Sequence, residues 1–177
     1  IKKLKLYVQN EKVHSVCIDM GPAELTPQKI PVDLEGQEII DRPVNIAGRE
    51  RRITCVSMGN PHCVVFDESL ASIDMDEVGP AFEYSPLFPE RVNVEFVTVI
   101  DQNTIKMRVW ERGNGETLST GTSACAGVVA AVLNGWCRKD QHILVKQKGG
   151  NLIVKYTDDT VFMTGKPETI FAGTVEI

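Results

Sequence analysis

Hydrophobic and polar residues alternate with a period of two along most of the chain, a pattern typical of half-buried β-strands. Residues 3–8 and 13–19 alternate on either side of the turn formers Gln9-Asn10-Glu11, and this predicts a hairpin. Residues 21–31 hold three prolines and are predicted to form a crossing loop. Further strands are predicted at 38–46, 51–58, 62–66, 92–100 and 104–111, with a three-stranded meander within 142–165.

One segment departs from this period. Residues 121–133 are apolar on every face, as in a helix that is buried all round, and Asn134-Gly135 follows it in the manner of a left-handed cap. Acidic residues at the start of 74–84 indicate a second helix there, despite Gly79 and Pro80. The pattern therefore predicts an α+β fold, in which a mixed or antiparallel sheet wraps around one buried central helix.

Composition excludes several function classes. The 177 residues suit one domain, and a net charge of −5 without any basic run gives a nucleic-acid backbone nothing to bind. The strongly apolar run 128–133 is far shorter than the roughly 20 residues that span a bilayer, so no membrane partner is predicted. Five cysteines without paired spacing fit a reducing cytoplasm. The three histidines lie far apart, and we expect no metal site.

The chemistry concentrates in the stretch 111–127, "ERGNGETLSTGTSACAG". A helix that begins at Gly121 leaves its first N–H groups without partners and carries partial positive charge there, so a small carboxylate would fit. Arg112 could add a bidentate contact to the same group. The alternative is that Ser119 or Thr120 merely caps the helix while Glu111 and Arg112 pair on the surface.

Two other stretches carry polar side chains among apolar ones. "MGNPHCVVF" places Asn60 and His62 in a turn between strands, where both are free to face a ligand. A lone histidine such as His62 is, however, more often a hydrogen-bonded structural residue. "FPERVNVEF" offers Asn93 in a strand of Val and Phe, where an Asn is usually an edge or bulge residue.

Together, "SMGNPHCVVF", "PLFPERVNVEFV" and "ERGNGETLSTGTSACAGVVAA" resemble the carboxy-terminal half of diaminopimelate epimerase, and both ends of the chain are similar as well. The resemblance implies two pseudo-symmetric lobes, each a sheet around a central helix, with the active site in the cleft between them. It assigns residues 1–20 to strands left from the end of the amino-terminal lobe and residues 21–177 to the carboxy-terminal lobe. The missing amino-terminal lobe would be a partner, and a homodimer is compatible.

The implied activity is isomerisation without a cofactor. The family converts LL- to meso-diaminopimelate in lysine and cell-wall precursor biosynthesis, in the cytoplasm, and uses one cysteine from each lobe to remove and return the α-proton. Carried over by motif, the substrate-binding residues are Asn60, Asn93, Glu111 and Arg112, with backbone donors from Gly121 and Thr122. The same motifs make His62 and Glu111 the residues that tune the acid and base.

The base itself departs from the family pattern, because Thr120 stands where the family has cysteine. A thiol has a reference pKa of about 8.5, whereas a threonine hydroxyl has no comparable anionic form. Cys125 is turned by about 140° and lies deeper along the helix, so we interpret it as a core residue. Thr120 is either a natural replacement or an introduced one, and we expect these 177 residues to be catalytically silent.

Two alternatives for the intact protein stay open. One is a related cofactor-free racemase or dehydratase, in which a single cysteine acts on one face of the substrate. The other is a non-catalytic relative that binds an amino acid. Exchange of the α-proton separates them, because a pure binder exchanges nothing.

Overall fold

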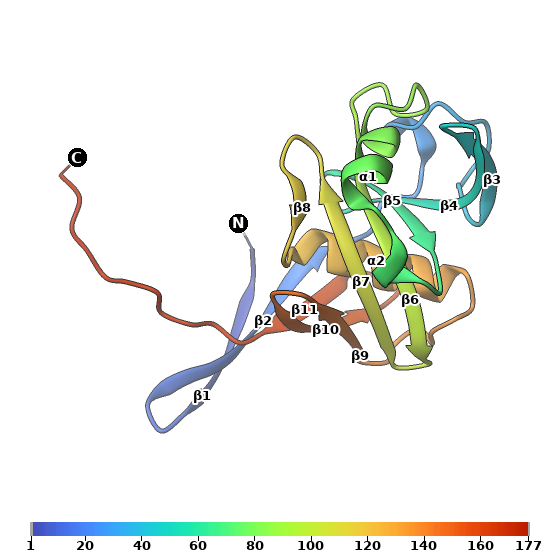
Figure 1. The fold of residues 1–177 in the computed structure, drawn as a ribbon. Coiled ribbons are helices and arrows are strands. Elements are labelled where there is room, and N and C mark those ends of the chain that lie inside the picture. The colour runs from blue at the N-terminus through green and yellow to red at the C-terminus, as the bar shows by residue number, and fades with distance from the viewer. Residues whose placement is uncertain (1, 177) are drawn as a thin grey trace.

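The computed structural model describes residues 2–176, which form one mixed sheet and two α-helices (Figure 1). The helices are α1 (Met75–Glu83) and α2 (Gly121–Leu133), and two 3₁₀ turns cover Pro27–Lys29 and Leu70–Ser72. The strands are β1 (Leu4–Gln9), β2 (Lys12–Gly21), β3 (Arg42–Ile46), β4 (Arg49–Ser57), β5 (Pro61–Phe66), β6 (Asn93–Asp101), β7 (Thr104–Glu111), β8 (Gly115–Thr117), β9 (Ile143–Gln147), β10 (Gly150–Tyr156) and β11 (Val161–Gly165).

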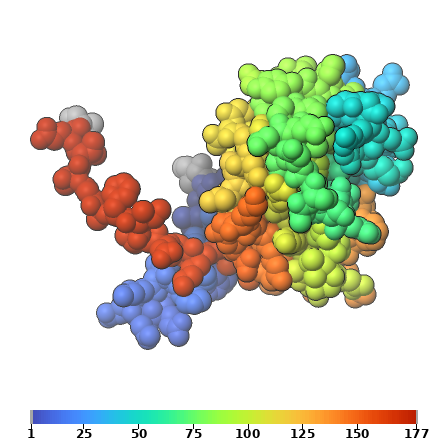
Figure 2. Space-filling view, in the orientation of Figure 1, coloured from blue at the N-terminus to red at the C-terminus, as the bar shows by residue number. Residues whose placement is uncertain are grey.

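The strands follow the order β1-β2-β11-β10-β9-β7-β6-β5-β4-β3, and β8 pairs with β7 beside this path. Two pairs are parallel, β5 with β6 and β7 with β9, and the other pairs are antiparallel. The β1–β2 hairpin and the extended residues 166–176 project from the body of the molecule, as Figure 2 shows. The sheet is mixed, as the sequence predicts.

Helix α2 is enclosed by the sheet. It contacts strands β4, β5, β6, β7, β9, β10 and β11, and the nine residues from Ser123 to Ala131 are buried (Figure 1). Such burial stabilises the fold by about 1.5–3 kcal/mol for a side chain the size of Val128 or Val129. The prediction of one buried central helix over residues 121–133 is confirmed, and so is the burial of Cys125, which has no exposed surface.

A second core lies on the other face of the sheet, because successive side chains of a strand point to opposite faces. In β5, Val64 packs toward α2, whereas Cys63 and Val65 pack toward α1. The start of α1 is fixed by Asp74, whose side chain accepts hydrogen bonds from two backbone N–H groups of the first turn. The helix predicted for residues 74–84 is therefore present as Met75–Glu83.

Two elements differ from the sequence prediction. The strand expected over 38–46 covers only Arg42–Ile46, because Ile39 is buried in the preceding loop and its carbonyl accepts a hydrogen bond from Cys55 N at 2.9 Å. The sequence does not predict strand β8, since its three residues, Gly115-Glu116-Thr117, carry no periodic signal. Across residues 2–176, no helix is both long and apolar enough to pass through a membrane.

Candidate functional site

The candidate site lies where α2 begins. Thr120 holds the N-cap position with extended backbone (φ −146°, ψ 136°), but its side chain makes no capping hydrogen bond. Its backbone is held by Gln147 instead: Thr120 N donates to Gln147 Oε1 at 3.0 Å, and Gln147 Nε2 donates to Thr120 O at 3.4 Å. The Thr120 hydroxyl therefore does not cap the helix, which contradicts the Thr120 part of the alternative that Ser119 or Thr120 does so.

Gly121 lets the start of α2 pack closely against the side chain of Met163. A Cβ atom at this position would lie 2.8 Å from Met163 Sδ, well inside van der Waals contact. The N–H groups of the first turn have no intrahelical partner, and the partial positive charge of the helix end adds to them. Gly121 and Thr122 are half-buried, so their donors lie at the rim of the core and not inside it.

A chain of polar side chains runs from Thr122 into the sheet. Asn60 Nδ2 donates a long hydrogen bond of 3.5 Å to Thr122 Oγ1, and Asn60 Oδ1 lies 2.9 Å from His62 Nε2. On the far side of the ring, His62 Nδ1 lies 2.7 Å from Glu95 Oε1. His62 belongs to β5 and has no exposed surface. The expectation that it sits in a turn is wrong, because β5 begins one residue earlier, at Pro61. Its burial contradicts the expectation that its side chain faces a ligand.

Asn93 opens β6, opposite His62 in the parallel β5–β6 register. It is neither an edge nor a bulge residue, since β6 lies between β5 and β7 inside the sheet and its register shift occurs at Val99. Its side chain instead bridges two backbones. Asn93 Nδ2 donates to Pro61 O at 2.9 Å, and Arg112 N donates to Asn93 Oδ1 at 2.9 Å. Asn93 thus locks the turn that carries Arg112 onto the strand that carries His62.

Glu111 and Arg112 stand at the turn between β7 and β8. They are not paired with one another: Glu111 Oε1 accepts from Thr117 Oγ1 at 2.7 Å, and Arg112 Nη1 donates to Glu90 O at 2.9 Å. The Arg112 side chain is exposed and keeps further N–H donors for a ligand. The alternative of a surface Glu111–Arg112 pair is therefore wrong.

A buried carboxylate supports this turn from the side of α1. Glu83 Oε2 accepts from Trp110 Nε1 at 2.7 Å, and Glu83 Oε1 accepts from Gly113 N at 2.9 Å and from Arg91 Nη1 at 3.4 Å. Burial alone would raise the pKa of Glu83, but these three donors hold it below the ordinary value. The side chain is an ionised anchor for the turn.

The structure thus joins most of the predicted site residues into one connected set. Contacts lead from Thr122 through Asn60 to His62, and strand pairing and the Asn93 side chain lead on to Arg112. Three positions that sequence reasoning missed support this set: Glu83, Glu95 and Gln147. A signal existed for two of them, because Glu95 shares a strand face with Asn93, and Gln147 shares one with the buried Ile143 and Val145.

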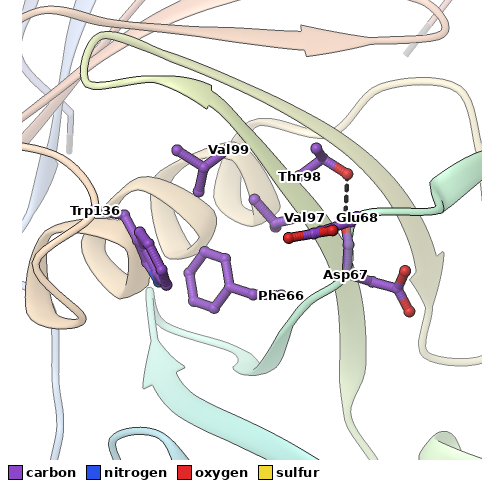
Figure 3. A pocket seen from close by; sticks show the side chains of 7 residues that line it. All are labelled: Phe66, Asp67, Glu68, Val97, Thr98, Val99 and Trp136. Atoms are coloured by element: carbon purple, nitrogen blue, oxygen red, sulfur yellow. Dashed lines mark hydrogen bonds between the residues drawn. The ribbon is translucent and has the colours of Figure 1, made fainter.

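The pocket in Figure 3 is a different place on the surface. It encloses about 320 Å³ beside the tilted ring pair of Phe66 and Trp136. Its lining residues are Phe66, Asp67, Glu68, Val97, Thr98, Val99 and Trp136, and none of them is a predicted site residue. Among residues 2–176, no group of three or more His, Cys, Asp or Glu side chains is arranged to hold a metal ion.

Cysteine reactivity tests the burial of Cys125 directly. Burial raises the pKa of the Cys125 thiol to about 12, and the Cys137 thiol is raised to about 11 for the same reason. Only Cys17 is partly exposed among the free cysteines. We expect a thiol reagent to label one site rapidly in the native chain and five after unfolding, because the thiolate is the reacting form. The variant Cys17→Ser should lose the rapid site. Rapid labelling of Cys125 in the native state would place its thiol in the open site.

Comparison with solved structures shows which fold the chain shares. A probable proline racemase from Agrobacterium radiobacter K84 superimposes with a TM-score of 0.70 over 99% of this chain and 57% of its own, at 13% identity. A hydroxyproline epimerase from Agrobacterium vitis gives 0.64 over 93% of this chain and 53% of its own, at 14% identity. At such identities the likeness shows the fold alone, which is that of the proline racemase and diaminopimelate epimerase class.

Sequence comparison is more specific. The family described as diaminopimelate epimerase matches residues 54–170, and the chain belongs to that family. Diaminopimelate epimerase of Acetivibrio thermocellus is 46% identical over 179 residues, which cover 100% of this chain and 63% of the relative. The enzyme of Agathobacter rectalis is 45% identical and is covered to 65%. The chain therefore spans less than two thirds of the length of these curated relatives.

Proposed function

We propose that the intact protein is a cofactor-independent amino-acid epimerase that acts on diaminopimelate in the cytoplasm, in the biosynthesis of lysine and cell-wall precursors. The observation that carries the proposal is the start of α2, where free helix N–H groups, the half-buried Asn60 and the exposed Arg112 belong to one connected set of contacts. Curated relatives of the same family, 46% and 45% identical, bear the name diaminopimelate epimerase.

The chemistry follows from charge. Removal of an α-proton beside a carboxylate builds negative charge, and donors that are already oriented stabilise it without reorganisation. In the proposal, the N–H groups of Gly121 and Thr122 receive the α-carboxylate. Asn60, Asn93, Glu111 and Arg112 bind the other polar groups of the amino acid, and for Asn93 this requires the turn at Arg112 to open, since its side chain is buried. Thr120 occupies the position of one of the two acid–base residues.

A second lobe of the intact protein belongs to the proposal. The hairpin presents one apolar face, on which Leu4, Leu6 and Val8 pair with Ile18, Val16 and Val13. Leu4 is 58% exposed and Val8 61%, and in the tail Phe171 is 85% exposed. Apolar surface of this kind marks an interaction site. We assign residues 1–20 and the tail to contacts with the amino-terminal lobe, which would also form the opposite wall of the site.

The test is solvent exchange by the intact protein. LL-diaminopimelate is incubated in D₂O, and both deuterium at the α-carbon and the meso product are measured over time. Exchange that outruns inversion supports an epimerase with a weak acid on one face. Complete absence of exchange, with the amino acid still bound, contradicts the proposal and leaves the non-catalytic binder, which the hydroxyl of Thr120 favours. Exchange of another amino acid but not of diaminopimelate would indicate a related racemase or dehydratase.

Two controls complete this test. The 177 residues alone should exchange no α-proton, because a single wall of the site is present. Mass measurement in solution, with and without the amino acid, tests the homodimer.

A further inference from the structure

The polar chain at the start of α2 ends at the buried carboxyl of Glu95. It leaves α2 at Thr122 and passes through Asn60 and His62 to Glu95, whose carboxyl adjoins Ser123 of the same helix. Ser123 Oγ and Glu95 Oε2 are both buried, and neither has a hydrogen-bond partner among the described residues. The Ser123 hydroxyl adjoins the Glu95 carboxyl and lowers its pKa. This chain of contacts thus links the first turn of the helix to β5 and β6.

Counting the protons along this chain of side chains gives a definite result. His62 Nε2 lies 2.9 Å from Asn60 Oδ1, and an amide oxygen only accepts, so Nε2 must carry a proton. A neutral imidazole has no second proton for Nδ1, which lies 2.7 Å from Glu95 Oε1. A proton must also stand between Nδ1 and the carboxyl. It resides either on Glu95, next to neutral imidazole, or on His62, next to a carboxylate.

The surroundings favour the first arrangement. Both side chains are fully buried, and separating charge in such a place is costly. Burial raises the pKa of Glu95, and the negative charge of Glu111 on β7 raises it further, against the lowering effects of His62 and Ser123. A protonated Glu95 donates to Nδ1 with one oxygen and leaves the other as an uncharged acceptor toward Ser123. The His62–Glu95 pair is then hydrogen-bonded without a net or separated charge.

We propose that Glu95 is a positioning residue, which by donating a proton to His62 Nδ1 fixes the Nε2–H tautomer and thereby the orientation of the Asn60 amide. His62 Nε2–H holds Asn60 Oδ1, so Asn60 turns its NH₂ group toward Thr122 and the start of α2. Asn60 then adds donors to those of the helix end. The inferred tautomer is independent of the proposed function, whereas the effect on substrate binding rests on that function.

The first test is spectroscopic and needs no activity. In the 177-residue chain that carries His14→Gln and His142→Gln, the only imidazole is His62, and its two ring nitrogens are observed by ¹⁵N NMR. We expect a protonated Nε2 and an unprotonated Nδ1 across neutral pH. A protonated Nδ1 with a bare Nε2 would mean that Asn60 is turned the other way, and two protonated nitrogens would mean an imidazolium beside a carboxylate. Either result overturns the proposal.

The second test uses two matched replacements of Glu95. Glu95→Gln keeps a donor for Nδ1 and an acceptor for Ser123, so it should retain the tautomer, the melting temperature and the affinity of the intact protein for its amino acid. Glu95→Met fills similar space without hydrogen bonds, and we expect it to lose the fixed tautomer and to weaken that affinity about tenfold. Equal behaviour of the two variants contradicts the proposal. If the wild type exchanges no α-proton, the proposed function fails, while the ¹⁵N result still decides the role of Glu95.

Discussion

In the intact protein, Thr120→Cys is expected to raise the rate of stereochemical inversion by about 10²-fold or more, the usual contribution of a well-placed acid or base. A threonine hydroxyl is a poor acid and a poor base, so the wild type should return the proton from this side slowly. The thiol would stand at the positive end of α2, where its pKa falls. Substrate affinity should hardly change, since the donors of Gly121 and Thr122 stay in place. Inversion and deuterium wash-in are measured side by side.

Two controls make this result specific. Thr120→Ser keeps a hydroxyl and should remain slow, which separates acidity from the loss of a methyl group. Cys125→Ser in the Thr120→Cys background should leave the gain intact, because Cys125 is buried and its pKa is raised to about 12. If Thr120→Cys leaves inversion unaltered, the base lies elsewhere, and the transfer of the family motif to this chain fails at its central residue.

Gly79→Ala is expected to lower the free energy of unfolding by about 3 kcal/mol, at the upper end for overpacking. A Cβ atom at Gly79 would lie 2.2 Å from Trp110 Cδ2 and 2.5 Å from Trp110 Cγ, so the indole ring would have to move. The ring cannot shift alone, because its N–H is bound to Glu83 and Trp110 directly precedes Glu111. Urea unfolding measures the loss, and the amide exchange of Gly113 should accelerate.

Gly127→Ala provides the matched control. Gly127 also lies inside a helix, but a Cβ atom there would meet Ile105 Cδ1 at 3.5 Å and Met107 Sδ at 3.6 Å, which is ordinary contact. Removing a helical glycine should then stabilise the chain by up to about 1 kcal/mol. If the two variants change stability alike, the clash with Trp110 is not what constrains Gly79.

Most of the fold can be predicted from the sequence, because its strands and its buried helix follow patterns of apolar and polar residues. An apolar segment without a polar face has to be enclosed, and residues 121–133 satisfy that condition with no charge among them. The alternating strands around this segment supply the enclosure. The sequence does not predict the three residues of β8 or the loop before β3. Each is held by particular tertiary hydrogen bonds and not by a local pattern.

The site is harder to predict from the sequence, because the residues that hold it in place come from distant segments. Glu83 lies on α1 and Gln147 on β9, yet they fix Gly113 and Thr120. The motifs indicated which residues could meet a substrate. They did not indicate that His62 is buried and acts through Asn60, since that depends on the pairing of β5 with β6. The face of a strand on which a residue lies follows from the local sequence, whereas the identity of the neighbouring strands does not.

The strand order also bears on how the chain folds. Antiparallel pairing of β2 with β11 sets Asp19 opposite Phe162, with most of the chain between them. Contacts of such long range close slowly, because loop entropy is lost before they form. During synthesis, α2 emerges before the strands β9, β10 and β11 that complete its enclosure. The more apolar of the two described helices is therefore exposed during that interval, and such surface is prone to aggregation.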